Sequence, residues 1–200
     1  YGRFTNGNML AISGDLNNPA ASTFELLQMT GFQSAHFIVG SNPTPAPLSG
    51  SGSYAFRGGT LSTAVDGSAI GNGVTSGTLD FDFGLNLAAL NMTVENASMI
   101  FNVSGPLFAL APGSTEFFAS TPFGLTAVSG LNTYTASAFG FFDTAGSSAP
   151  LAAGLTYTIN TLSPFTGAAG FGNVGIVNPA PLAIGNYVAF AHGFIDIVGL

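Results

Sequence analysis

The chain contains no cysteine, no tryptophan and no lysine, and its only strongly cationic side chains are Arg3 and Arg57. Without cysteine, a disulfide scaffold, a zinc cage built from thiolates and thiol catalysis are all excluded. Two cations do not neutralise a run of phosphates, so nucleic acid is excluded as a partner, and an anionic membrane surface is disfavoured for the same reason.

Charge and long apolar runs are also scarce. Only 6% of the 200 residues are charged, and nine acidic residues bring the net charge to -7. Mean hydropathy is +0.47, yet apolar runs such as Leu87–Leu90 end within a few residues, far short of the ~18 residues of a membrane helix. A transmembrane barrel would share the alternating pattern but needs aromatic girdles, so we expect no membrane insertion. The 19 Phe and 5 Tyr argue against disorder.

Short runs of alternating polar and apolar residues dominate the middle of the chain, as half-buried strands require. Thr78–Phe83, Leu90–Glu95 and Ser98–Ser104 are the clearest, and Thr133–Phe142, Gly154–Asn160 and Thr166–Phe171 continue the series. With Gly and Pro between the strands, the pattern predicts an all-β fold, a mainly antiparallel β-barrel of about eight strands. Its predicted inner layer includes Phe56, Leu79, Phe81, Met92, Phe101 and Tyr157.

The N-terminal region predicts a hairpin followed by the one short helix of the fold. Strands at Tyr1–Phe4 and Met9–Ser13 flank a turn at Thr5–Asn8. Asn18 is a suitable N-cap followed by Pro19, and Gly31 is a suitable C-terminal stop. We therefore expect a helix between Asn18 and Gly31.

The C-terminal 28 residues differ from the rest, which predicts a barrel domain over 1–172 and a linker and extra strand over 173–200. Pro179 and Pro181 interrupt the chain before the strand Tyr187–Val198, which is apolar on both faces. Such a strand needs cover on both sides, from its own domain or from the next subunit. The predicted self-assembly residues are Tyr187, Val188, Phe190, Phe194, Ile195 and Ile197.

Several glycine-rich motifs, Tyr1–Phe4, Ala35–Gly40, Gly52–Phe56, Gly77–Phe83 and Gly167–Phe171, together resemble a module of bacterial surface proteins. The module is similar to the small barrel of transferrin-binding-protein-like lipoproteins, with related copies in exported proteins that carry FecR-type domains. The resemblance covers roughly residues 1–172 and implies an eight-stranded barrel in an exported protein. It does not imply transferrin binding.

Two groups of residues are candidates for metal or acid–base chemistry. Asp80 and Asp82 share a strand face, about 7 Å apart, which suits Ca²⁺ if a third oxygen donor joins them, or else a solvated outer wall. Glycoside hydrolysis by this acid pair has no further support. His36 and His192, the only histidines, suit a metal or haem site if they meet, and a structural role if they do not. We predict neither metal nor cofactor.

No serine lies in a nucleophile elbow, since the run Gly50–Ser53 follows a proline-rich loop and not a strand that enters a helix. We therefore predict a protein that is not an enzyme. Asn91, Asn96 and Asn102 begin three glycosylation sequons whose use the sequence leaves open.

Two function classes follow for a secreted or cell-surface protein. The first is a non-catalytic structural protein that associates with itself, as a filament, layer or adhesin subunit, through β-strand addition. The second is a secreted barrel that binds haem or another small hydrophobic ligand. The near absence of charge and the doubly apolar C-terminal strand favour the first.

Overall fold

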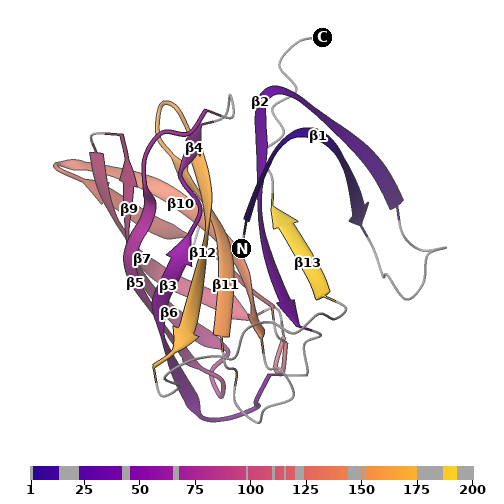
Figure 1. The fold of residues 1–200 in the computed structure, drawn as a ribbon. Helices are drawn as coiled ribbons and strands as arrows, with labels where there is room; N and C mark the ends of the chain where they lie inside the picture. Colours follow the sequence, from indigo (N-terminus) through magenta and orange to yellow (C-terminus); the bar gives the residue numbers. More distant parts are fainter. Residues whose placement is uncertain are drawn as a thin grey trace.

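The structure, a computed structural model, describes residues 2–13, 23–41, 46–64, 68–97, 99–109, 111–114, 116–119, 124–143, 150, 152–174 and 187–192. In these residues all regular structure is β. Ten strands form one antiparallel sheet that closes on itself, and three form a second, smaller sheet beside it (Figure 1). The predicted all-β fold, a mainly antiparallel barrel, is thereby confirmed.

The barrel strands follow one another in sequence, and most pair with their neighbours along the chain. They are β3 (Ser51–Gly59), β4 (Thr63–Ala64), β5 (Gly73–Asp82), β6 (Leu87–Asn96), β7 (Met99–Ala109), β8 (Glu116–Ala119), β9 (Leu125–Ser129), β10 (Asn132–Asp143), β11 (Ala152–Asn160) and β12 (Phe165–Asn173). The order β3-β5-β6-β7-β8-β10-β11-β12 returns to β3 through the β12–β3 ladder. This closure removes the unpaired edges that an open sheet would expose.

Eight strand places surround the barrel, because β8 and β9 occupy one place between them. Both lie between β7 and β10: β8 pairs with residues 138–141 of β10, and β9 pairs with residues 132–136. The short β4 pairs with β12 beyond the end of β3. The wall therefore has the predicted number of strands, with one of them split in two.

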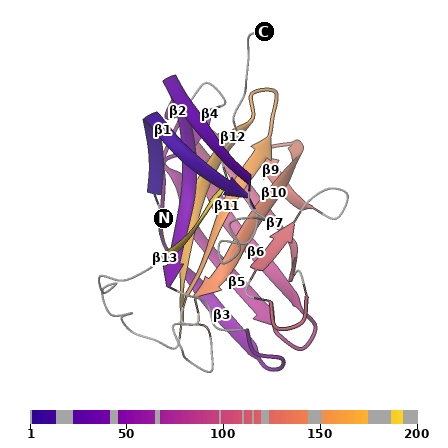
Figure 2. The ribbon, with the colours of Figure 1, turned by 90° about the vertical axis from the view of Figure 1, so that its right-hand side faces the viewer.

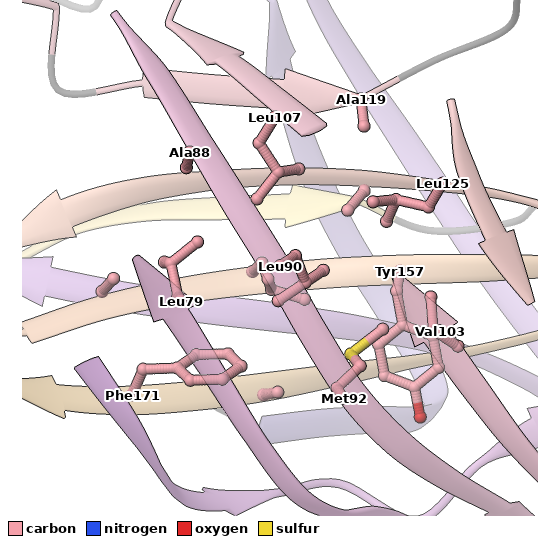
Figure 3. Packing of buried hydrophobic residues seen from close by; sticks show 14 of the residues in the cluster. Leu79, Ala88, Leu90, Met92, Val103, Leu107, Ala119, Leu125, Tyr157 and Phe171 are labelled. Atoms are coloured by element: carbon pink, nitrogen blue, oxygen red, sulfur yellow. The ribbon is translucent and has the colours of Figure 1, made fainter. Parts of the chain in front are cut away.

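The barrel interior is filled by side chains. Alternate residues of β5, β6 and β7 point inward, so that Leu79, Leu90 and Phe101 are fully buried. Figure 3 shows how side chains from strands on opposite sides of the barrel, including Leu90, Tyr157 and Phe171, meet in the middle. Of the predicted inner layer, Leu79, Phe81, Met92, Phe101 and Tyr157 are buried, whereas Phe56 is partly buried and packs edge-on against Phe171.

Aromatic rings gather at one end of this core. The ring of Phe142 lies 4.8 Å from those of both Phe81 and Phe117, and 5.5 Å from that of Phe83. Such tilted contacts add to the free energy gained by burying the rings themselves. A second group of rings, in which Phe101 lies 5.2 Å from Phe165 and 5.8 Å from Tyr134, belongs to the same core, and Leu, Val and Ala fill the remaining space.

The second sheet, sheet A, comprises β1 (Gly2–Ser13), β2 (Thr23–Ser41) and β13 (Tyr187–His192), in the order β1-β2-β13. It lies against the outside of the barrel, with β2 over β10, β11 and β12 (Figure 2). Both ladders of sheet A are antiparallel. Sheet A therefore joins the two ends of the chain on one outer wall.

The predicted helix is wrong where the structure describes it. Residues 18–22 lie outside the described residues, but residues 23–31 belong to β2 and not to a helix. Here Thr23 to Met29 pair with Ser13 to Gly7 of β1. Hydrogen bonds from a neighbouring strand override the local helical spacing of apolar residues, because helix propensity is a weak preference.

The predicted turn at Thr5–Asn8 is also wrong. β1 continues through it as a single strand, with a register shift between Thr5 and Gly7. Glycine beside polar residues marks a β-bulge here, which bends a strand without reversing it.

Candidate functional site

The predicted self-assembly strand lies at the edge of sheet A. Its ladder runs from Tyr187, opposite Ser41, to His192, opposite His36. Of the predicted residues, Tyr187, Val188 and Phe190 belong to β13, while Phe194, Ile195 and Ile197 lie outside the described residues. Phe190 is the register partner of Ile38. The site therefore comprises β13, its partner β2 and the seam between β2 and the barrel.

Ile38 anchors β2 to the outer wall of the barrel. It is 2% exposed and forms a small apolar cluster with Phe141 of β10 and Ala168 of β12. It also lies against Gly154 of β11, where a Cβ atom would come within 3.3 Å of the Ile38 side chain. Because Gly154 of β11 has no side chain, Ile38 of sheet A can pack closely against the barrel wall.

His36 forms the polar half of the same seam. Its Nδ1 atom lies 2.7 Å from Thr60 Oγ1 and its Nε2 atom 2.8 Å from Thr63 Oγ1. Thr60 Oγ1 also accepts a hydrogen bond from the Ala168 amide at 2.9 Å. A neutral imidazole satisfies this set when the Thr60 hydroxyl donates to Nδ1 and Nε2–H donates to Thr63. The buried histidine therefore links β2 to β12 and to the segment around β4.

The two histidines do meet in the backbone register, contrary to the structural interpretation in which they stay apart. His192 is the Cα partner of His36, and Arg3 is the partner on the other side. Three of the four Arg and His residues of the chain thus occupy one row of sheet A. Both ring nitrogens of His36 are within hydrogen-bond distance of threonines. Across the described residues, no group of three or more His, Asp or Glu is arranged to hold a metal ion.

Asp80 and Asp82 lie on the outer wall of β5, where both are exposed. Asp82 Oδ1 accepts hydrogen bonds from the amides of Gly84 and Leu85, at 2.9 and 3.0 Å. This carboxylate therefore stabilises the turn between β5 and β6, as short acidic residues commonly do. The geometry gives the pair a solvated position in which one member caps a turn.

Arg57 is one of the two arginines of the chain and lies on the barrel wall. It is exposed on β3, and its Nε lies 2.7 Å from where a Cβ of Gly172 would stand. Where the structure describes the chain, no ion pair joins it to a carboxylate. The Arg57 side chain therefore packs over Gly172 of the neighbouring strand β12.

The sequons differ in their exposure. Asn91 and Asn102 are exposed on the outer wall of β6 and β7, whereas Asn96 is 6% exposed at the end of β6. Since glycan transfer needs an accessible amide, the positions open to modification in the folded chain are Asn91 and Asn102.

Surface pockets bordered by described residues lie along the outer wall, among them the following three. One of about 400 Å³ borders Ser53, Asp80 and Pro106, and one of about 500 Å³ borders Thr78, Asn91 and Ser104. The third, about 280 Å³, is the most enclosed and is lined by Phe118, Ala119, Ser137, Ala138, Phe139, Thr156, Tyr157 and Thr158. Sequence reasoning missed this pocket. Because Tyr157 points into the barrel, alternation places its neighbours Thr156 and Thr158 on the outer face. No pattern in the sequence indicates that β8 lies beside them.

No helix in the described part of the chain has the length and apolar character to cross a membrane. No protein-family model, no curated protein and no solved structure matches the chain. The resemblance to the surface-protein barrel remains a prediction.

Proposed function

We propose that the chain is a non-catalytic structural protein of the cell exterior that assembles by exchanging β13 between copies. In the assembly, β13 of one copy pairs with β2 of the next in the register that the single chain has, Tyr187 opposite Ser41. The observation that carries the proposal is the position of β13: it pairs with β2 at the edge of sheet A, apart from the closed barrel.

The connection to β13 is long enough for exchange. Residues 174–186 join the end of β12 to Tyr187, and an extended segment of this length spans about 45 Å at most. An exchanged strand makes the same backbone hydrogen bonds in its neighbour as in its own chain, so exchange costs little free energy. Transfer from each copy to the next is head-to-tail and leads to an open filament unless the rotation closes a ring.

The barrel itself supports a structural role over ligand binding inside it. Its interior holds a continuous cluster of buried side chains, including five aromatic rings at one end. A barrel that holds a small molecule needs part of this space free. His36, a candidate haem ligand, is hydrogen-bonded through both ring nitrogens outside the barrel. These features favour assembly over the secreted ligand-binding barrel.

The test uses the absence of cysteine from the chain. Val39 and Ala189 are register partners, so Val39→Cys and Ala189→Cys are made as two separate single variants and refolded together. Exchange brings the two thiols together across copies, and non-reducing electrophoresis then shows a disulfide-linked heterodimer. The pair Thr78→Cys and Asn91→Cys, register partners within the barrel wall, is the control and gives no such heterodimer.

Deletion of residues 175–200 gives a second readout. We expect the shortened chain to be monomeric by size-exclusion chromatography with its β circular dichroism spectrum retained, while electron microscopy shows filaments or large oligomers of the full chain. A full chain that stays monomeric at high concentration, with no heterodimer from the mixed cysteines, would overturn the proposal.

A further inference from the structure

The most enclosed of the three surface pockets lies on the outer wall over β8, β10 and β11. Phe118 and Phe139, which are register partners, border it with their partly buried side chains. Ser137 and Thr158, also register partners, contribute hydroxyls, and Thr156 contributes a third. The pocket thus combines two aromatic rings with three hydroxyls.

Thr158 is the residue that needs an explanation. Its side chain is only 4% exposed, and no described residue forms a hydrogen bond with its hydroxyl. By contrast, the Thr156 hydroxyl donates to the Phe139 carbonyl at 3.4 Å. A buried hydroxyl without a partner destabilises the fold, and native proteins seldom keep one. A ligand in the pocket would supply the missing partner.

The chemistry of the lining selects the class of ligand. No lining residue carries a charge, so the pocket offers a charged ligand no ionic partner. A purely apolar ligand would leave the hydroxyls of Thr158 and Ser137 without hydrogen bonds. A ring with one apolar face and hydroxyls at its rim suits both the phenylalanines and the hydroxyls. We propose that this pocket binds one ring of an uncharged sugar.

The surroundings of the pocket suit a longer neutral glycan. Next along β10 and β11 lie Thr135 and Asn160, and the Asn160 amide donates to the Thr135 hydroxyl at 3.2 Å. Their row continues across the wall through exposed hydroxyls and amides in direct register: Thr126, Ser104, Asn91 and Thr78. Further rings of the glycan would lie along this uncharged row.

The test is a titration of the full chain with uncharged hexasaccharides of glucose, mannose and N-acetylglucosamine, followed by calorimetry and by the methyl NMR signal of Thr158. Hexagalacturonate is the charged comparison, and toluene is the apolar one. We expect saturable binding of at least one uncharged hexasaccharide, with a shift of the Thr158 methyl signal, and no comparable binding of hexagalacturonate.

Thr158→Val keeps the shape and removes the hydroxyl. The loss of one hydrogen bond to the sugar should weaken binding roughly three- to tenfold. The same variant should melt at an unchanged or higher temperature, because the hydroxyl has no hydrogen-bond partner among the residues that the structure describes. Thr133→Val, an exposed position on β10 outside the pocket, is the matched control with unchanged affinity.

Three results would overturn the inference: no uncharged hexasaccharide binds, toluene alone binds in the pocket, or Thr158→Val binds as tightly as the natural chain. The inference is independent of strand exchange, since the pocket lining comes from β8, β10 and β11 of one barrel. The test can therefore be run on the chain shortened by residues 175–200 as well as on the full chain, once the shortened chain is seen to fold.

Discussion

Ile38 of sheet A packs on the bare backbone of Gly154 in the barrel wall, where an added Cβ would lie 3.3 Å from both Cβ and Cγ2 of the isoleucine. Phe141 and Ala168 complete the surface that Ile38 covers. This contact is the apolar part of the seam between the two sheets, and His36 is the polar part.

Gly154→Leu should separate sheet A from the barrel while the barrel stays folded. The new side chain occupies the place of Ile38, and overpacking of this kind commonly costs about 1–3 kcal/mol. Hydrogen exchange should then lose protection in β2 and retain it in β5 and β6. The double variant Ile38→Ala, Gly154→Ala makes room for the added methyl. The double variant should therefore be destabilised by less than the sum of the two single variants, and strict additivity would contradict the contact.

Phe81→Ala should destabilise the barrel by roughly 3–5 kcal/mol, because it removes a buried ring and leaves a cavity. Phe81 is 3% exposed and its ring lies 4.8 Å from those of Phe83 and Phe142. Phe108, which is 36% exposed on the outer wall, is the matched control, and its replacement by alanine should cost far less. Chemical denaturation measures both; equal costs would mean that the inner and outer faces are wrongly assigned.

The barrel should lose stability at alkaline pH through two buried tyrosines. Burial raises the pKa of Tyr54 and of Tyr157 well above the usual range, and the Ser62 hydrogen bond offsets only part of this for Tyr157. Unfolded tyrosine ionises near pH 10, so above that pH the unfolded state binds fewer protons and stability falls. The slope is about 1.4 kcal/mol per pH unit for each tyrosine.

Ultraviolet absorbance, which reports tyrosinate, checks this behaviour. Two of the five tyrosines should ionise only as the circular dichroism signal of the barrel is lost. In Tyr157→Phe the loss of stability with rising pH should be shallower by the contribution of one tyrosine, about 1.4 kcal/mol per pH unit. Ionisation of all five before unfolding would show that the two rings are accessible to water.

Dialysis against a chelator should leave the melting temperature unchanged, because the seam around His36 is satisfied by threonine hydroxyls. Elemental analysis of material purified without chelator tests the same point. One equivalent of metal that disappears when both His36 and His192 are replaced would instead mean that the register partners form a metal site.

His36→Phe keeps a ring in the seam but removes both hydrogen bonds to Thr60 and Thr63. Each neutral hydrogen bond contributes about 1 kcal/mol, and the stranded hydroxyls add to the loss. We expect about 2–3 kcal/mol of destabilisation, with hydrogen exchange faster in β2 than in the far wall of the barrel. Uniform loss of protection would mean that sheet A and the barrel unfold together.

Alternation carried most of the information about the barrel. Where one face meets the core and the other meets water, as in β5 with Leu79 and Asp80, period-two spacing located the strand and its inner face. The split place of β8 and β9 was missed, because each strand is only four or five residues long. Runs that short carry too few alternating residues to stand out from loops.

The candidate site was only partly predictable. The apolar character of Tyr187 to Phe190 indicated a strand, but no local pattern names Ile38 or Ser41 as partners, since pairing between the two ends of the chain is a tertiary effect. The same holds for the helix predicted near Phe24, which became strand because β1 pairs with it. Within the described residues the Thr158 hydroxyl has no hydrogen-bond partner. This depends on how the strands pack, so the sequence gives no sign of it.

The direction of the β13–β2 ladder has a mechanical consequence for a filament. The register starts where Tyr187 meets Ser41 and ends where His192 meets His36. β13 joins its own barrel at the Tyr187 end, and β2 leads through Ser41 toward β3 of the neighbouring one. Tension would therefore enter and leave at the same end, and the pairs would open one at a time. If the proposed filament forms, it would therefore open at low force and pair again once the tension is removed, and the pairs at Ile38 and His36 would open last.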